Sequence, residues 1–365
     1  MSSIIFLFFY NFVKISLLFY FIDLFIVKIL YFMSVKISEC VSLGHPDKIA
    51  DYISCYILDE FIKQDPYTKY ALEVQVKDNT INLAGEVSSK CEDIDYKALC
   101  QKALIDIGYN KDYIAKWGGE NVINYEEIHV NTFISKQSQT IAQGLSGWGD
   151  QGIFFGMAVR NESTDYMPFD YFLAKDINKK LFASNLGGLD IKTQVVTKGN
   201  DITKIIVAIP LLNNDTKNVE EFVRQNYKGN YELIVNGTGS YISHSSIADC
   251  GITGRKLVVD FYGSGCNIGG GSPWTKDGTK ADLTLNLYAR KKALDYLKSS
   301  NKDYIKCQIG CCIGRKEIEV IITDKNDEVL EFYVENRLPE EIINEFNLRT
   351  PIYSLLCKDG LFSRI

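Results

Sequence analysis

Glycine, lysine and aspartate are concentrated in one stretch of the sequence, GGGSPWTKDGTKAD, at residues 269–282. Glycines let a backbone approach a phosphate closely, lysines neutralise its charge, and aspartates bind the accompanying metal ion. The P-loop pattern G-x-x-x-x-G-K-[ST] does not occur in it. Lys276 and Lys280 fall on one side if the loop continues into a helix, and Asp282 is placed to bind a metal. The stretch predicts a phosphate site of another design.

A second group of polar residues, GHPDK at residues 44–48, stands where a helix is predicted to begin. The free N–H groups and the dipole at a helix N-terminus favour an anion. His45 can donate a hydrogen bond to a phosphate or bridging oxygen there, and Asp47 can bind Mg²⁺ through oxygen. Helix capping alone would also account for Asp47.

Two further segments combine an acid or a pair of cations with glycine. GWGDQGIFFG, at residues 147–156, places Asp150 where it can accept hydrogen bonds from a ribose, an amine or adenine. A glycine-rich turn before a core strand is the simpler alternative. ADCGITGRKLVVD, at residues 248–260, places Arg255 and Lys256 before a predicted strand, where such cations often hold phosphate. A solvated strand end would look the same.

A weaker signal is LDIKTQV, at residues 189–195. Asp190 and Lys192 stand two positions apart at the start of a predicted strand, so both side chains point to one face. Each of these segments has an ordinary structural explanation when taken alone. Their joint occurrence does not.

The composition limits the classes of protein. A chain of 365 residues, 46% hydrophobic and 24% charged, is typical of a soluble globular protein with two or three domains. The net charge of −6 argues against a nucleic acid or an anionic membrane surface as a partner. The ten cysteines include no C-x-x-C pair, which favours reduced thiols in the cytoplasm over structural zinc. Three histidines disfavour a multi-histidine metal centre.

Residues 1–32 are almost wholly apolar and long enough to span a bilayer. No small-residue cleavage site follows them, so a signal peptide is not indicated. They are either a membrane tether or upstream sequence read through before a true start at Met33. Because a soluble pattern begins at Met33, we favour the second explanation and expect residues 1–32 to lie outside the fold.

Apolar periodicity predicts strands and helices that recur in a similar order three times. The sequence therefore predicts an α+β protein of three related units, at residues 33–134, 146–242 and 243–365. The predicted helices cover residues 44–66, 94–109, 169–184, 216–227 and 281–300. The predicted strands cover residues 35–43, 70–87 (a pair), 125–135, 151–160, 192–199, 202–212, 256–263, 304–314 and 316–324.

In chain order, GHPDKIAD, KQS, GDQGIFFG, DIKTQV, DCGITGRKLVVDFYG and GGG…KDGTKAD resemble the S-adenosylmethionine synthetases, or methionine adenosyltransferases. The resemblance covers essentially all of residues 38–364, and GHPDK, GDQG and DCG-TGRK are its most specific motifs. It implies three similar α+β domains about a pseudo-threefold axis. It also implies a homodimer with active sites between the subunits, and sometimes a tetramer. The implied substrates are ATP and L-methionine, and the implied cofactors are Mg²⁺ (two per site) and K⁺.

The implied reaction is attack of the methionine sulfur on C5′ of ATP, which displaces tripolyphosphate that is then cleaved to pyrophosphate and phosphate. Sulfur is already a good nucleophile, so the charge on the leaving group is the main difficulty. The resemblance assigns the catalytic and phosphate-binding roles to His45, Lys192, Arg255, Lys256, Lys276 and Lys280. It assigns the nucleoside to Asp190, Tyr241 and Asp249, and methionine to Glu86, Gln137, Asp150, Asp249 and Lys280. It assigns Mg²⁺ to Asp47 and Asp282, and K⁺ to Glu73.

The sequence also departs from the family pattern. The segment at residues 136–147 is shorter than the family's mobile active-site loop, from which we expect weaker closure. Ser240 replaces an arginine, and Tyr241 replaces a phenylalanine that stacks on adenine, a role that tyrosine can keep. Residues 244–246, His-Ser-Ser, replace a Gly-Gly-Pro turn, and Leu283 stands where an arginine is usual. The C-terminus is abbreviated, which bears most on a tetramer interface.

Two other functions fit parts of the pattern. A polyphosphate or nucleotide phosphohydrolase would need the cations but not Glu86 and Asp150, which serve the amino-acid and nucleoside ends. A catalytically silent regulatory homologue would be free to lose the phosphate-binding cations, and all five are present. We therefore favour the synthetase.

Overall fold

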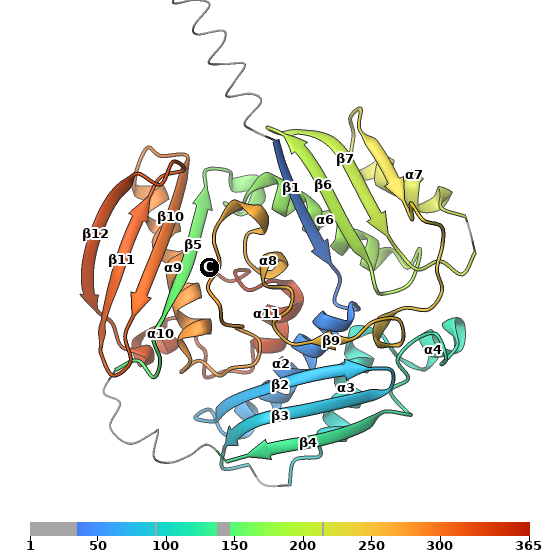
Figure 1. Cartoon of the computed structure of the whole chain (residues 1–365), viewed down its shortest axis with the longest axis horizontal. Coiled ribbons are helices and arrows are strands. Elements are labelled where there is room, and N and C mark those ends of the chain that lie inside the picture. Colours follow the sequence, from blue (N-terminus) through green and yellow to red (C-terminus); the bar gives the residue numbers. More distant parts are fainter. Residues whose placement is uncertain (1–34, 92, 137–146, 214) are drawn as a thin grey trace, which may run out of the picture.

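The computed structural model describes residues 35–91, 93–136, 147–213 and 215–365. Three four-stranded sheets surround a central group of helices (Figure 1). This arrangement confirms the predicted α+β class and its three similar parts. Residues 1–34, which include the apolar N-terminal stretch, lie outside the description. Among the residues it covers, no helix combines the length and the apolar character needed to cross a membrane.

The first part of the chain has the order strand, helix, hairpin, helices, strand. Its elements are β1 (Val35–Val41), α2 (Pro46–Gln64), β2 (Lys69–Lys77), β3 (Thr80–Ser88), α3 (Tyr96–Ile107), α4 (Lys111–Trp117) and β4 (His129–Ser135). Pro46 suits the first turn of α2, where its missing N–H leaves no helical bond unmade. The apolar residues Ile49, Ile53, Ile57 and Phe61 are all buried, as the sequence periodicity predicted.

The middle of the chain repeats the order of the first part. Its elements are β5 (Gly152–Val159), a 3₁₀ turn (Glu162–Thr164), α6 (Phe169–Ser184), β6 (Lys192–Lys198), β7 (Asp201–Ala208), α7 (Lys217–Asn226) and β8 (Glu232–Val235). In both parts a helix separates the hairpin from the last strand, and that strand pairs parallel to the second strand of the hairpin.

The last part keeps the beginning of this order. Its elements are a 3₁₀ turn (Ser245–Ile247), β9 (Gly251–Ile252), α8 (Leu257–Asp260), a 3₁₀ turn (Gly263–Gly265), α9 (Ala281–Ser299), β10 (Tyr304–Cys311), β11 (Glu317–Thr323), β12 (Val329–Asn336), α10 (Pro339–Glu345) and α11 (Tyr353–Asp359). No helix separates β11 from β12, so these two strands are antiparallel.

The leading strand of each part pairs with the hairpin of another part. β1 pairs antiparallel with β6, β5 with β10, and β9 with β2. Each sheet thus has the order leading strand, hairpin, last strand, and the exchange passes cyclically around the three parts, as a pseudo-threefold arrangement requires. The division at residues 33–134, 146–242 and 243–365 stays a prediction, since every sheet draws strands from two of these segments.

The strand exchange brings distant motifs together. Val41, at the end of β1, lies opposite Lys192, the first residue of β6. The GHPDK segment that follows β1 is therefore held beside Asp190 and Lys192. The helices α2, α6 and α9 each pack on the leading strand and the hairpin of one sheet (Figure 1).

The predicted strand at residues 256–263 is wrong. Residues 257–260 form α8, and a 3₁₀ turn follows. A short apolar run does not distinguish a strand from a buried helical turn, so the surroundings decide. Here Asp260 is buried, and its carboxylate binds both Lys48 and Trp274.

Candidate active site

His45 is the N-cap of α2 and is almost fully buried. Its Nδ1 accepts a hydrogen bond from the backbone N–H of Asp47 at 3.1 Å, so the neutral ring carries its proton on Nε2. Burial, and then the cations Lys256 and Lys192, lowers the pKa of His45 to about 3. At neutral pH the ring is therefore an uncharged donor at a helix N-terminus.

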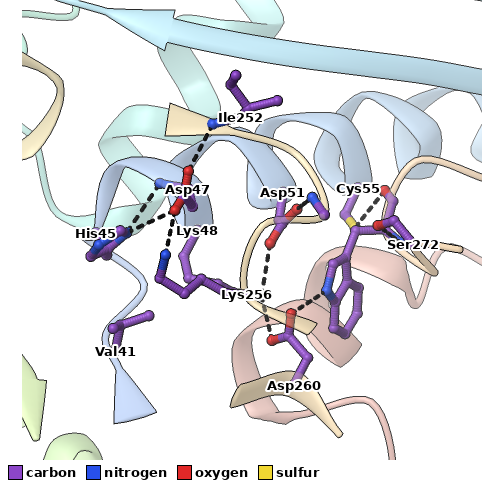
Figure 2. Close-up of polar contacts among 12 residues, drawn as sticks. Val41, His45, Asp47, Lys48, Asp51, Cys55, Ile252, Lys256, Asp260 and Ser272 are labelled. Atoms are coloured by element: carbon purple, nitrogen blue, oxygen red, sulfur yellow. Dashed lines mark hydrogen bonds and ion pairs between the residues drawn. The ribbon is translucent and has the colours of Figure 1, made fainter. Parts of the chain in front are cut away.

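The Asp47 carboxylate joins α2 to the DCG-TGRK segment (Figure 2). Its Oδ1 accepts a hydrogen bond from the backbone N–H of Ile252 at 2.9 Å, and its Oδ2 accepts one from Lys256 Nζ. Arg255 Nε lies 3.8 Å from Oδ1. Burial raises the pKa of Asp47, but the hydrogen bonds from Lys256 and Ile252 outweigh it and the pKa is lowered. Helix capping is thus done by His45, and Asp47 serves to hold the cations.

The contact between these segments depends on Gly251. A Cβ there would lie 2.1 Å from the carbonyl oxygen of Pro46, closer than any side chain allows. The glycine of the DCG motif therefore lets the backbone of β9 lie against the first turn of α2.

Asp190, Lys192, Asp249 and Tyr241 complete this group. Burial raises the pKa of Asp190 to about 6, while Lys192 lowers it and Asp249 raises it. Asp190 Oδ2 accepts a hydrogen bond from the Ser245 N–H at 3.1 Å. Burial, and secondarily Asp190, raises the pKa of the half-buried Tyr241. We call His45, Asp47, Asp190, Lys192, Tyr241, Asp249, Arg255 and Lys256 the helix-start cluster.

A buried ionic network lies beside this cluster (Figure 2). Lys48 Nζ lies 2.7 Å from Asp260 Oδ1 and 3.1 Å from Asp51 Oδ2, and 4.5 Å from the centre of the Trp274 ring. Trp274 Nε1 donates to Asp260 Oδ2 at 2.7 Å, and Gly254 N–H donates to Asp51 at 2.9 Å. No role was predicted for these side chains from the sequence. The available signal was the charge of Lys48 and Asp51 next to the apolar residues Ile49 and Ile53 of α2.

The His-Ser-Ser segment that departs from the family pattern positions Asp190. His244 Nε2 lies 2.6 Å from the Tyr113 hydroxyl, and its Nδ1 lies 2.6 Å from the Ile242 carbonyl oxygen. The Tyr113 hydroxyl accepts a hydrogen bond from the Leu189 N–H at 2.8 Å, next to Asp190. Burial lowers the pKa of His244 to about 4, so its ring is neutral at physiological pH. No sequence motif indicated this role.

The glycine-rich stretch forms a second group, the loop cluster, made of Asp150, Lys276, Asp277, Lys280 and Asp282. Lys276 Nζ binds Asp282, and Lys280 Nζ lies 2.9 Å from Asp277 Oδ1. The helix α9 begins only at Ala281, so the two lysines do not share a helix face. Asp277 is buried and also accepts a hydrogen bond from the Tyr70 N–H at 2.8 Å, which anchors the loop to β2.

Asp150 stands at the edge of the loop cluster. It is exposed, and its carboxylate accepts a hydrogen bond from the Gln151 N–H at 2.7 Å. The Cys311 thiol donates to the Asp150 carbonyl oxygen at 3.4 Å, and both Asp150 and Asp282 raise the pKa of that thiol. Asp150 and Asp282 therefore border the same thiol.

The remaining predicted residues lie on the sheet with the order β4-β3-β2-β9 or outside the described residues. Glu73, on β2, accepts a hydrogen bond from the Thr253 hydroxyl. Ala71 pairs with Glu86 on β3 and with Lys276 on the other side, so the loop cluster adjoins Glu86. Gln137 lies outside the described residues. Within the described ranges no hydrogen bond or ion pair directly joins the helix-start cluster to the loop cluster.

The carboxylates can be compared with what Mg²⁺ requires. This ion usually binds one or two carboxylates together with water and substrate phosphates, rather than a cage of protein ligands. Residues 35–91, 93–136, 147–213 and 215–365 contain no group of three or more potential metal ligands. Asp282 is partly exposed and Asp47 is bound to a lysine, so each offers a single carboxylate beside cations. This donor set fits an ion held largely by a polyphosphate.

The fold and the two clusters define an enzyme that binds a highly anionic substrate. Lys192, Arg255 and Lys256 gather around an uncharged imidazole donor, and Lys276 and Lys280 stand on a glycine-rich loop. The adjoining carboxylates suit the ribose or amine of a nucleoside or amino acid.

Comparison with known proteins identifies the family. Models of the N-terminal and C-terminal domains of S-adenosylmethionine synthetase match residues 33–139 and 244–365. The chain is 34% identical over 377 residues to the S-adenosylmethionine synthase of Borrelia garinii subsp. bavariensis, covering 91% of this chain and 93% of that protein. It is 32% identical over 368 residues to that of Mesoplasma florum, covering 90% and 94%.

A solved structure indicates the same family. The "unusual S-adenosylmethionine synthetase from Campylobacter jejuni" matches with a TM-score of 0.80 and 29% identity, covering 90% of this chain and 94% of that one. The chain belongs to the S-adenosylmethionine synthetase family, which confirms the family predicted from the motifs.

Proposed function

We propose that this protein synthesises S-adenosylmethionine from ATP and L-methionine through a site divided between its two clusters. By family it is a methionine adenosyltransferase, which does not favour the phosphohydrolase or the silent homologue. The observation that carries the proposal is the neutral Nε2–H donor of His45 beside Lys256 and Lys192. A departing phosphate oxygen requires this combination of donor and cations.

In the proposed reaction a lone pair of the methionine sulfur forms a bond to C5′ of ATP. The C5′–O bond breaks, its electrons remain on oxygen, and tripolyphosphate leaves as the sulfonium product forms. His45 donates a hydrogen bond to the departing oxygen while Lys192, Arg255 and Lys256 neutralise the phosphates nearest to it. Water then cleaves the tripolyphosphate to pyrophosphate and phosphate, and Lys276 and Lys280 hold the charge that this step carries.

The carboxylates and Tyr241 hold the rest of the substrates. Asp190 and Asp249 bind the nucleoside, and the ring of Tyr241 stacks on adenine. The buried Asp190 is held by Ser245, which supports a fixed role in recognition. Methionine binds at Glu86, Gln137, Asp150, Asp249 and Lys280.

Metal ions complete the proposed site. Asp47 and Asp282 would each hold one Mg²⁺, which supplies positive charge to the polyphosphate when bound. Glu73 would bind K⁺ near Thr253. The described thiols are all unpaired, which supports a reducing location, and we place the enzyme in the cytoplasm.

We infer that the working unit is a homodimer, with a tetramer as a further possibility. Two observations support the dimer. The cations stand in two clusters that no hydrogen bond or ion pair joins among the residues the structure describes, which supports a site completed by a second chain. Strands of all three sheets also expose large apolar side chains, among them Ile37, Phe133, Ile153, Phe332 and Val334. Exposed apolar area of this kind marks protein interfaces.

The test is turnover by the purified full-length protein with ATP, L-methionine, Mg²⁺ and K⁺, with products followed by mass spectrometry. We expect S-adenosylmethionine, pyrophosphate and phosphate in equal amounts. Loss of ATP without a sulfonium product would instead indicate a phosphohydrolase. Folded protein that binds ATP and turns over nothing would indicate a silent homologue.

A further inference from the structure

A cavity of about 260 Å³ lies between α6 and the C-terminal segment. Its wall includes Tyr171, Phe172, Lys175, Asp260, Arg290 and Phe362, and no member of either cluster lines it. Figure 1 shows the C-terminus near the centre of the molecule, among the helices. A space of this size is at the lower end for organic ligands, so it suits a small molecule.

The carboxylates on the cavity wall already have cationic partners or face solvent. Asp165 is exposed. The other three each pair with a lysine: Asp176 with Lys180 at 2.7 Å, Asp359 with Lys179 at 3.3 Å, and Asp260 with Lys48 at 2.7 Å.

Arg290 is a buried cation that forms no ion pair with a carboxylate anywhere in the described ranges; Asp165 acts on it only at longer range. Arg290 is 1% exposed, and its NH1 and NH2 groups donate to the backbone carbonyls of Met157, Asp165 and Tyr166. Its Nε is buried and has no hydrogen-bond partner. Carbonyl dipoles satisfy the N–H groups but leave the full positive charge in place.

Lys175 is a second cation of the same kind. It is half-buried and makes no hydrogen bond or ion pair with any residue in the described part of the chain, and its ammonium lies 5.9 Å from the centre of the Tyr171 ring. Its Nζ lies beside Gly360, 2.0 Å from where a Cβ on that residue would be. Burial lowers the pKa of Lys175, and the more distant Cys40 and Asp260 offset this only in part.

Apolar side chains form the rest of the wall. Phe362 is buried and stacks on Tyr262 at a centroid distance of 4.8 Å, and Phe172 and Leu361 face the same cavity. A ligand here would thus meet both cations and aromatic carbon.

We propose that this cavity binds a small organic anion, a carboxylate or phosphate monoester with an aromatic or aliphatic body. Its acid group pairs with Lys175 in the field of Arg290, and its body packs against Phe172 and Phe362. The inference does not depend on the proposed reaction, because none of these residues belongs to either cluster.

The test is binding of fluorobenzoate and fluorophenyl phosphate to the full-length protein, measured by fluorine NMR titration. We expect saturable binding of at least one probe and none of fluorobenzyl alcohol, which has the same body without the charge. Whichever anion binds more tightly identifies the acid group. Saturating MgATP should leave binding unchanged. Displacement by MgATP would mean that the probe occupies the substrate site, and the proposal would fail.

Two substitutions locate the probe. Lys175→Met keeps the alkyl stem and should weaken binding at least tenfold. Lys204→Met is the control, because Lys204 lies outside the cavity wall and pairs with Glu232 at 2.7 Å, and it should change binding less than threefold. Ser363→Trp fills the exposed rim of the cavity without changing its charge and should also weaken binding. An unchanged thermal midpoint shows that each variant is folded. No saturable binding of either anion to the wild type, or equal binding to Lys175→Met, would overturn the proposal.

Discussion

The two clusters place the same kinds of side chain on very different supports. In the helix-start cluster, Asp47 is 1% exposed and holds Lys256 at the point where α2, β9 and the start of β6 converge. In the loop cluster, Lys276 and Asp282 are each about one-fifth to one-quarter exposed and pair within a glycine-rich loop. An added Cβ on Gly271 would collide with the Asp282 carboxylate, so the loop closes tightly on its own ion pair.

The difference separates two demands of polyphosphate chemistry. Charge that develops on one leaving oxygen is best met by groups that need not move, and the buried His45 and Asp47, with Lys256 bound to Asp47, meet that demand. A polyphosphate must also enter and leave, which favours lysines held by carboxylates that a phosphate can displace. We therefore expect substitution of the partly exposed Lys276 to affect activity alone, and substitution of Lys256, which holds the buried Asp47, to affect activity and stability together.

The largest expected effect is that of Lys276→Met on turnover. Removal of a cation from a developing polyphosphate charge is expected to lower kcat by about 10³-fold, in line with the loss of a single oxyanion donor. Its ion pair with Asp282 is partly exposed and is expected to contribute less than about 1 kcal/mol to stability. Steady-state kinetics and urea unfolding measure the two effects. A destabilised or unfolded variant would contradict the assignment of Lys276 to a partly exposed ion pair that a phosphate can displace.

Lys256→Met is expected to reduce turnover by about 10²-fold and also to destabilise the protein. The substitution leaves the buried Asp47 carboxylate with only the Ile252 N–H and the more distant Arg255. An uncompensated buried charge is costly, and here we expect about 2–3 kcal/mol. The matched control is Arg255→Met, since the Arg255 side chain is half exposed and its loss should cost much less stability. If Lys256→Met and Lys276→Met have equal unfolding free energies, the contrast between the clusters is wrong.

The sequence predicted local structure better than it predicted partners. Pro46 and the fourfold spacing of Ile49, Ile53 and Ile57 identified α2, because capping and periodicity are local signals. The pairing of β1 with β6 joins residues about 150 positions apart, and no local pattern distinguishes it from pairing with the adjacent hairpin. The strand predicted over residues 256–263 failed for the same reason. Contacts of Asp260 with distant side chains decide the conformation there.

The candidate site shows the same limit. Motifs indicated His45, Asp47 and Lys256 as polar residues near a ligand, but not that Lys256 would bind Asp47 across more than 200 positions. Nor could they reveal Lys48, which is charged yet buried in the network with Asp260 and Trp274. A buried charge is recognised only once its partner is known.

The surroundings of the helix-start cluster also make stability depend on pH. His244 is buried beside the helix-start cluster, and its pKa is lowered from 6.5 to about 4. A lowered pKa means that the unfolded chain binds the proton first, so stability is lost as the pH falls from about 6.5 toward 4. His244→Gln should remove about 2 kcal/mol of the loss between pH 7 and pH 5. His129→Gln is the control, because His129 is exposed.

The experiment compares His244→Gln with the wild type. The free energy of unfolding is measured in urea at pH 7 and at pH 5. Asp51 and Asp190 have raised pKa values, of about 7 and about 6, and they act in the opposite direction over this range. Their effect cancels when His244→Gln is compared with the wild type. An unchanged pH dependence in His244→Gln would show that the pKa of His244 is not lowered in the folded protein.

The smallest expected effect is also the sharpest test of how the two clusters meet. If one chain's helix-start cluster faces the partner's loop cluster, coexpression of Lys256→Met with Lys276→Met yields mixed dimers with one intact site and one doubly defective site. Random pairing makes half of the dimers mixed, so turnover should recover to about a quarter of the wild-type value. Lys256→Met coexpressed with Lys192→Met is the control, because both changes lie in the same cluster and leave every mixed site defective. Recovery in neither pair would place both lysines of a site in one chain, and the clusters would then have to come together within the subunit.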